Sequence, residues 1–201
     1  MLYWQISHQT RVKYLARLHA ARPGDRLILG KQLGIGIYST TLKRGDLSAS
    51  DYEAMIVSAT QINTPGPMLA CLDGVHAVTD VTGFGLLGHL IGVCRRSGVG
   101  ARVRFAALPL LAQALAFAEA GYVGGASRRN WGSFGEDVRL AEGIGGKERA
   151  VLTDPQTSGG LLVSCSPDTV TEVLSMFLQQ GFSHVSVIGE VVAGEPAVAV
   201  S

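Results

Sequence analysis

The stretch TDVTGFGLLGHL, residues 79–90, combines one carboxylate, three spaced glycines and an amphipathic run. Gly83, Gly85 and Gly88 form a G-x-G-x-x-G pattern between an apolar strand and a helix, which is the order that a dinucleotide-binding turn requires. Two features disfavour that interpretation: no acidic residue follows about 20 positions later to hold a ribose hydroxyl, and Asp80 would repel a pyrophosphate. A carboxylate before a flexible turn instead favours a hard oxygen ligand for Mg²⁺, with phosphates reached through the metal.

A second motif, DPQTSGGLLV, covers residues 154–163. Together the two motifs resemble the C-terminal half of the selenophosphate synthetase (selenide, water dikinase) family, which belongs to the aminoimidazole-ribonucleotide synthetase-like (PurM-like) superfamily of ATP-using proteins. The resemblance runs from about Arg22 to the C-terminus. Gln32 stands where the family usually has the proline of Lys-Pro-Leu-Gly, so a proline's backbone restriction is not expected there. Further matches are Gly24-Asp25, the segment 31–36, Arg129-Asn130-Trp131 and the segment 187–191.

The resemblance implies a fold and a division of roles. The expected fold is α+β, a mixed β-sheet packed with helices, like the PurM C-terminal domain. Asp80 is the expected metal ligand of this chain and would bind Mg²⁺. Other carboxylates, a catalytic lysine and a reactive cysteine or selenocysteine belong to the family's N-terminal half, to which no segment here corresponds. We therefore assign no catalytic residue, and we expect the chain to be half an enzyme that is inactive alone.

The resemblance also implies partners. ATP is the expected substrate, bound mainly by the N-terminal half, together with Mg²⁺ and selenide. That half would come from the same protein or from a partner chain, and the complete enzyme is expected to be a homodimer that makes selenophosphate, AMP and phosphate. Two alternatives stay open: half of another PurM-like ATP-dependent enzyme, and an interaction module without turnover.

Composition sets further bounds. With 201 residues, 47% hydrophobic and 16% charged, the chain is expected to bury a sizeable core in one domain. The net charge of +1 and the scattered basic residues disfavour nucleic-acid binding. No apolar run reaches the roughly 18 residues of a membrane span, and the N-terminus has no signal-peptide pattern. Cys71, Cys94 and Cys165 form no C-x-x-C, which disfavours structural zinc and suits a reducing cytoplasm.

The chain is expected to divide into a lead-in segment, residues 1–22, peripheral or poorly ordered, and a PurM-like C-terminal domain, residues 23–201. Ser50 and Glu53 predict a capping box at a helix start, and Thr82 is expected to cap the helix of the first motif. Helices are expected over 50–62, 85–96, 110–120 and from 166 to about 180. Strands are expected over 26–29, 35–41, 76–81, 101–105, 160–165, 185–192 and 197–200. The segment from 123 to about 146 is expected to be a long loop with short pieces of structure.

Several candidate residues carry two interpretations. For Asp80, the metal ligand is weighed against a turn-forming aspartate. For the Asp154–Gly160 turn, substrate contact is weighed against a turn that only leads into a buried strand. Asn130 is either a substrate contact or a solvent-exposed loop residue. His89 favours a structural role over catalysis. The motif glycines favour a tight turn and close backbone approach, and Cys94 and Cys165 favour small core residues over reactive thiols.

Overall fold

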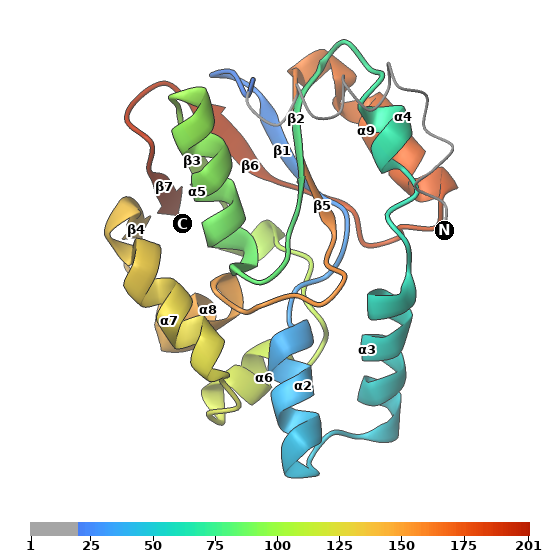
Figure 1. Cartoon of the computed structure of the whole chain (residues 1–201), viewed down its shortest axis with the longest axis vertical. Coiled ribbons are helices and arrows are strands. Elements are labelled where there is room, and N and C mark those ends of the chain that lie inside the picture. Colours follow the sequence, from blue (N-terminus) through green and yellow to red (C-terminus); the bar gives the residue numbers. More distant parts are fainter. Residues whose placement is uncertain (1–19) are drawn as a thin grey trace.

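The computed structural model describes residues 20–201, and within them the strands form one seven-stranded mixed sheet flanked by helices (Figure 1). The sheet order is β2-β5-β1-β6-β3-β7-β4, antiparallel from β2 to β3 and parallel where β7 pairs with β3 and β4. This confirms the predicted α+β class. The strands are β1 (Arg26–Leu29), β2 (Val75–Asp80), β3 (Gly100–Val103), β4 (Val138–Leu140), β5 (Leu161–Cys165), β6 (Ser186–Val192) and β7 (Val198–Val200).

The predicted lead-in segment, residues 1–22, lies outside the described residues except for positions 20–22. Among the residues that are described, none of the helices has the length and apolar character needed to cross a membrane.

Helices cover both faces of the sheet. Helices α5, α7 and α8 lie on one side, α4 and α9 lie on the other, and α2, α3 and α6 lie beyond one end of the sheet (Figure 1). Their bounds are α2 (Ile35–Arg44), α3 (Ala49–Thr60), α4 (Gly66–Leu69), α5 (Gly85–Ser97), α6 (Ala114–Glu119), α7 (Gly125–Phe134), α8 (Gly146–Leu152) and α9 (Val170–Gln179), with short 3₁₀ turns η3 (Phe105–Ala107), η4 (Gly135–Asp137) and η5 (Pro167–Thr169).

The central strands are buried on both faces. In β1, Leu27 and Leu29 pack in the larger core with α5, whereas Ile28 packs in the smaller core with α9. In β5, Leu162 faces the larger core and Leu161 the smaller one. Because successive side chains of a strand point to opposite faces, a strand covered on both sides needs a continuous apolar run. This explains why both strands could be recognised in the sequence.

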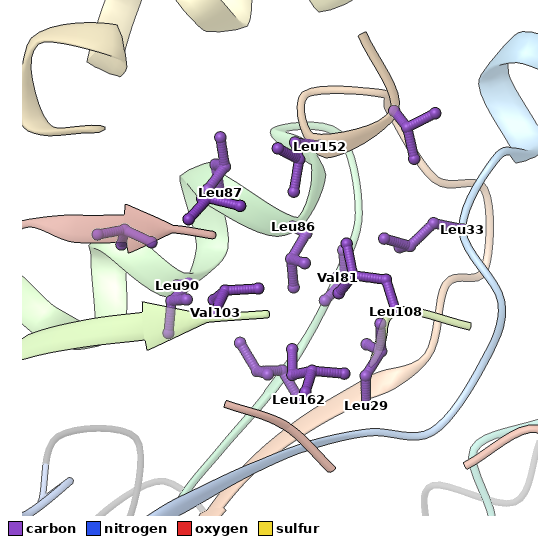
Figure 2. Close-up of a cluster of buried hydrophobic side chains, with 14 of the residues drawn as sticks. Leu29, Leu33, Val81, Leu86, Leu87, Leu90, Val103, Leu108, Leu152 and Leu162 are labelled. Carbon is purple, nitrogen blue, oxygen red and sulfur yellow. The ribbon is translucent and has the colours of Figure 1, made fainter. Parts of the chain in front are cut away.

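The larger core anchors the helix of the first motif to the sheet (Figure 2). Leu86, Leu87 and Leu90 of α5 are fully buried and lie in one core with Val81, which directly follows β2, and with Leu162 of β5. Burial of each such side chain contributes about 1.5–3 kcal/mol of transfer free energy. The turn that carries Asp80 is therefore held between a strand and a helix that are both fixed by the core.

The strand predicted over 35–41 is wrong, because these residues form helix α2. The β-branched side chains there favour a strand by propensity, but long-range contacts override that preference. Gly34, with a φ of 120°, turns the chain into the helix. The first N–H groups of α2 are then capped by side chains 118 and 122 positions away, from Asp154 and Gln156. A cap so distant in sequence leaves no local signal.

The segment 123–146, predicted as a long loop with short pieces of structure, is more regular than expected, since it contains the ten-residue helix α7 as well as the short strand β4. The buried positions of α7 are Ser127, Asn130 and Phe134, which follow helical spacing. Two of these three are polar, so the hydrophobic period that identifies a helix is hidden. Hydrogen bonds from the two polar residues hold this helix against its neighbours.

The predicted cap of α3 is displaced. The helix begins after Ser48, whose Oγ accepts a hydrogen bond from the N–H of Asp51 at 3.1 Å. The box expected from Ser50 and Glu53 is not formed. The helix predicted over 110–120 is shortened to α6, because Leu110 pairs with Leu33 in an isolated bridge.

Candidate functional site

The two motifs meet at one end of the sheet, where the loop before β5 runs beside the loop between β2 and α5 (Figure 1). The N–H of Val81 donates to the carbonyl of Gly160 at 2.9 Å, and the N–H of Gln156 donates to the carbonyl of Thr82 at 3.0 Å. Asp80 pairs with Leu161 in the antiparallel ladder. The residues that carry the resemblance therefore form one structural unit, although they are about 75 positions apart.

Glycines allow the two motif turns to touch. A Cβ on Gly159 would lie 2.0 Å from the carbonyl oxygen of Val81, and one on Gly85 would lie 2.7 Å from the carbonyl carbon of Thr153. Gly85 also has a φ of 68°, which disfavours any residue with a side chain. By contrast, a Cβ on Gly83 would meet nothing within 4 Å. The G-x-G-x-x-G spacing thus serves backbone packing at Gly85.

Asn130 ties the two turns together. Its Nδ2 donates to the carbonyl of Gly83 at 2.9 Å and to that of Thr153 at 3.0 Å. The side chain is buried, so the interpretation of Asn130 as a solvent-exposed loop residue is wrong. Both donor hydrogens are used within the protein, which accounts for an asparagine here without a substrate.

Asp154 and Gln156 cap helix α2. Oδ2 of Asp154 accepts the N–H groups of Gly36 at 2.9 Å and Ile37 at 3.2 Å, and Oε1 of Gln156 accepts those of Gly34 and Ile35 at 3.3 Å each. The positive end of this helix is thereby filled by side chains of the protein. Any phosphate would have to be bound elsewhere.

The carboxyl group of Asp154 is fully buried. Burial raises its pKa to about 7, although the hydrogen bonds from Ile37, Gly36 and Gln156 oppose that rise. Within the described residues, Oδ1 of Asp154 has no hydrogen-bond partner. The second motif therefore contains a group that titrates near neutral pH.

Asp80, the predicted metal ligand, is exposed at the end of β2. No group of three or more His, Cys, Asp and Glu side chains capable of holding a metal exists in the part of the chain that the structure describes. An exposed carboxylate at a strand end fits one ligand of a Mg²⁺ ion whose remaining ligands are substrate phosphates, water or carboxylates of another segment. The described residues alone do not complete such a site.

The prediction that Thr82 caps α5 is wrong, because the helix begins after Phe84 and has no side-chain cap. Thr82 instead contacts His89. The N–H of Thr82 donates to Nε2 of His89 at 3.0 Å. Burial lowers the pKa of His89, and the charge of Asp80 partly opposes this. An Nε2 that accepts a hydrogen bond belongs to a neutral imidazole. In this geometry His89 is therefore neutral and stabilises the turn at Thr82 through that hydrogen bond.

Lys31 is a buried residue whose geometry was not predicted. Its Nζ donates to the carbonyls of Ser58 at 3.2 Å, Gln61 at 2.5 Å and Ser158 at 2.6 Å. Burial lowers the pKa of Lys31 to about 8. A cavity of about 550 Å³ opens beside it, between α3 and the segment 181–184. The sequence signals were a lysine shortly after an apolar strand and its place in the segment 31–36 that resembles the family.

Two further groups of residues are structural in this geometry. Asp25 accepts hydrogen bonds from Ser164 Oγ at 2.7 Å and lies 2.8 Å from Nδ1 of His76, which links β1, β2 and β5. Cys94 and Cys165 are buried, and burial raises their thiol pKa values to about 11 and about 12. Thiols that stay protonated at neutral pH are poor nucleophiles, in line with the predicted core role.

Comparisons with known proteins identify the family. A family model described as AIR synthase related protein, C-terminal domain, matches residues 22–201. The selenide, water dikinase of Dechloromonas aromatica (strain RCB) is 64% identical over 186 residues, which covers 92% of this chain and 53% of that protein. The selenide, water dikinase of Burkholderia pseudomallei (strain K96243) is 52% identical over 196 residues, covering 98% and 54% respectively. The chain thus spans about half the length of the curated relatives it matches.

Solved structures share the fold at low identity. A thiamine-monophosphate kinase from Stenotrophomonas maltophilia K279a matches with a TM-score of 0.63 and 21% identity, covering 92% of this chain and 52% of that one. The hydrogenase maturation protein HypE of E. coli matches with a TM-score of 0.59 and 20% identity, covering 89% and 46%. With the fold, the joined motifs and the family model in agreement, the chain belongs to the AIR synthase related proteins, as their C-terminal domain, and corresponds to the C-terminal half of the selenide, water dikinases.

Proposed function

We propose that residues 23–201 of this chain form the PurM-like C-terminal domain of a selenide, water dikinase. This domain closes over a nucleotide that an N-terminal half holds. The complete enzyme converts ATP, selenide and water to selenophosphate, AMP and phosphate, works in the cytoplasm as a homodimer, and uses Mg²⁺. When bound, Mg²⁺ supplies electrostatic stabilisation of the transferring phosphoryl groups. The N-terminal half supplies the remaining metal carboxylates, the lysine and the nucleophile.

The observation that carries this proposal is the position of Asp80. Its carboxylate is exposed at the strand end where the two motifs join, and the neighbouring turn is fixed by Asn130, by Thr82 with His89 and by the packed glycines. A rigid support around one exposed carboxylate is what a metal-positioning ligand needs. The level of identity to selenide, water dikinases supports this reaction over those of other PurM-like enzymes.

Replacing Asp80 tests the proposal in an enzyme reconstituted from this chain and an N-terminal half. Asp80→Asn keeps the size of the side chain and removes the charge that holds Mg²⁺. Turnover should fall on the order of 10²-fold or more, while the free energy of unfolding should change by no more than about 0.5–1 kcal/mol, because the side chain is exposed. Mg²⁺-dependent AMP formation and thermal unfolding measure the two effects.

A matched control is Asp168→Asn, which alters another exposed carboxylate, in the 3₁₀ turn before α9. It should leave turnover unchanged. Near-normal turnover of Asp80→Asn together with a sharply lower melting temperature would make Asp80 a turn-forming residue and reject the metal role.

The chain by itself should not catalyse selenophosphate formation. Within residues 20–201 it offers Asp80 without the further carboxylates of a metal cluster, and its two buried thiols stay protonated. We expect no selenide-dependent AMP formation from ATP by the purified 201-residue protein, and formation once an N-terminal half is added. AMP production by the chain alone would overturn this part of the proposal, whereas no production even after the addition would favour a non-catalytic interaction module.

A further inference from the structure

The turn of the second motif has N–H groups without acceptors. Within residues 20–201, the N–H groups of the four consecutive residues 157–160 form no hydrogen bond. Thr157 and Ser158 are exposed, whereas Gly159 and Gly160 are buried. A backbone N–H that is buried without a partner costs free energy comparable to a lost hydrogen bond. Such a run of donors therefore calls for an acceptor from outside residues 20–201, such as water or a ligand.

Two carbonyl groups of the same turn, those of Ser158 and Gly159, accept hydrogen bonds from side chains. Nζ of Lys31 binds the carbonyl of Ser158 at 2.6 Å, and Nδ2 of Asn63 binds that of Gly159 at 2.9 Å. In a trans peptide the N–H points opposite to the C=O of the same plane, and the described residues contain no cis peptide. The N–H groups of Gly159 and Gly160 therefore point away from Lys31 and Asn63.

The backbone conformation of the turn is specialised. Ser158 has a φ of 53°, and it is the non-glycine residue with positive φ in the described part of the chain. A left-handed residue among right-handed or extended neighbours brings successive N–H groups together into a concavity that binds anions, called a nest. The ammonium of Lys31 on the Ser158 carbonyl also polarises that peptide and strengthens its N–H as a donor.

We propose that the N–H groups of residues 157–160 form an oxyanion site that holds a phosphate group directly, beside Asp80, the metal ligand of the proposed function. Asp80 pairs with Leu161, so the carboxylate and the turn lie at the same end of the sheet. A phosphate between them would contact the amides on one side and a cation at Asp80 on the other. The inference rests on the proposed function for the origin of the phosphate, which is either a phosphate of the nucleotide or the released phosphate product. Binding of a phosphate by the amides of this turn can be tested separately from the proposed function.

The test is a titration of the ¹⁵N-labelled 201-residue chain with sodium phosphate, followed by amide chemical shifts, in EDTA and with NaCl at matched ionic strength as the blank. We expect saturable shifts at the amides of 157–160 that chloride does not produce. Asp80→Asn should retain these shifts and tighten phosphate binding about threefold, because a nearby like charge is removed. A parallel titration with ADP separates the sources: tighter binding than phosphate assigns the site to the nucleotide, and equal or weaker binding assigns it to the free product.

A second variant tests whether the hydrogen bond from Asn63 orients the N–H groups of the turn. Asn63→Ala releases the Gly159 carbonyl and should weaken phosphate binding about 3- to 10-fold while the protein stays folded. Gln61→Ala is the control, since its Nε2 donates to the carbonyl of Gly181 and not to the turn. An unchanged phosphate affinity in Asn63→Ala would argue against this orientation of the N–H groups by Asn63.

Two results overturn the proposal. One is the absence of shifts at 157–160 in a folded sample at saturating phosphate. The other is shifts that need Mg²⁺ and vanish in Asp80→Asn, which would leave the metal role of Asp80 intact and show that phosphate is reached through the metal alone. Conversely, magnesium-free binding together with normal turnover of Asp80→Asn would reject the proposed metal ligand and keep the oxyanion site.

Discussion

Oδ2 of Asp154 lies 2.9 Å from the backbone nitrogen of Gly36, and a Cβ at Gly36 would lie 2.5 Å from the other carboxylate oxygen. The first turn of α2 and the second motif are thus fitted to each other across 118 positions. Only glycine leaves room for the carboxyl group at this distance. The DPQTSGG turn therefore has a folding role, to cap α2, that is separate from any contact with a ligand.

The buried Asp154 should make stability depend on pH. Its pKa is raised from 3.8 to about 7 in the folded protein, so between these values the folded state holds a proton that the unfolded state has lost. By linkage, the contribution of Asp154 to stability is largest below pH 4 and decreases as the pH rises to 7. Asp154→Asn removes this titration. The difference in free energy of unfolding between parent and variant, measured by denaturant from pH 4 to 8, should shift in favour of the variant as the pH rises. A constant difference would contradict the raised pKa.

Two glycines of α5 should respond in opposite ways to alanine. A Cβ on Gly88 would lie 2.6 Å from Cβ of Phe84 and 2.8 Å from the ring of Phe134, whereas a Cβ on Gly92 meets nothing within 4 Å. Gly88→Ala should destabilise the protein by about 1–3 kcal/mol through overpacking. Gly92→Ala should stabilise it by up to about 1 kcal/mol, because alanine is the better helix former. Chemical denaturation of both variants measures this. Equal effects would mean that the motif glycine is not needed for packing.

Asn130→Ala should destabilise the protein by about 1–3 kcal/mol, because the carbonyls of Gly83 and Thr153 would lose their donor. Ser133→Ala on the same helix is the control. Ser133 is exposed and its hydroxyl returns to the carbonyl of Arg129, so its loss should cost no more than about 0.5 kcal/mol. Urea unfolding of the two variants gives the comparison. A loss in Asn130→Ala no larger than in the control would contradict the role of Asn130 as a tie between the two turns.

Much of the fold was predictable because its determinants are local. The apolar stripe of α5 and the runs in β1 and β5 are set by their own residues, and the structure confirms these elements. Gly98 ends α5 in the left-handed conformation, two residues after the predicted end of that helix at 96. Helices α2 and α7 were missed for physical reasons: α2 is capped by residues distant in sequence, and α7 buries Ser127 and Asn130 where a pattern search requires apolar residues.

The site was predictable only in part. The motifs located Asp80 and the Asp154–Gly160 turn, and the structure brings the two together through Val81 and Gly160. The convergence of three carbonyls on Lys31 was not predictable, because they belong to residues 58, 61 and 158 and meet only after folding. A sequence pattern gives residue types at a spacing, whereas hydrogen-bond satisfaction in a buried turn is a property of the tertiary structure.

Lys31→Met should destabilise the protein by about 1–3 kcal/mol at neutral pH, since the methionine keeps the apolar stem and leaves the carbonyls of Gln61 and Ser158 without their donor. The three carbonyl contacts favour the charged ammonium, but burial is the larger effect and lowers the pKa from 10.5 to about 8. Between these values the folded state has released a proton that the unfolded state still holds, so this group's contribution to stability rises as the pH increases from 8 to 10.5 and is lost as it falls through 8. The free-energy gap between parent and variant should therefore widen over that range, while other titrating groups cancel in the difference. Denaturant unfolding of both proteins at pH 7.5, 9 and 10.5 measures it. A gap that stays constant or narrows would mean that the carbonyls outweigh burial and keep Lys31 charged.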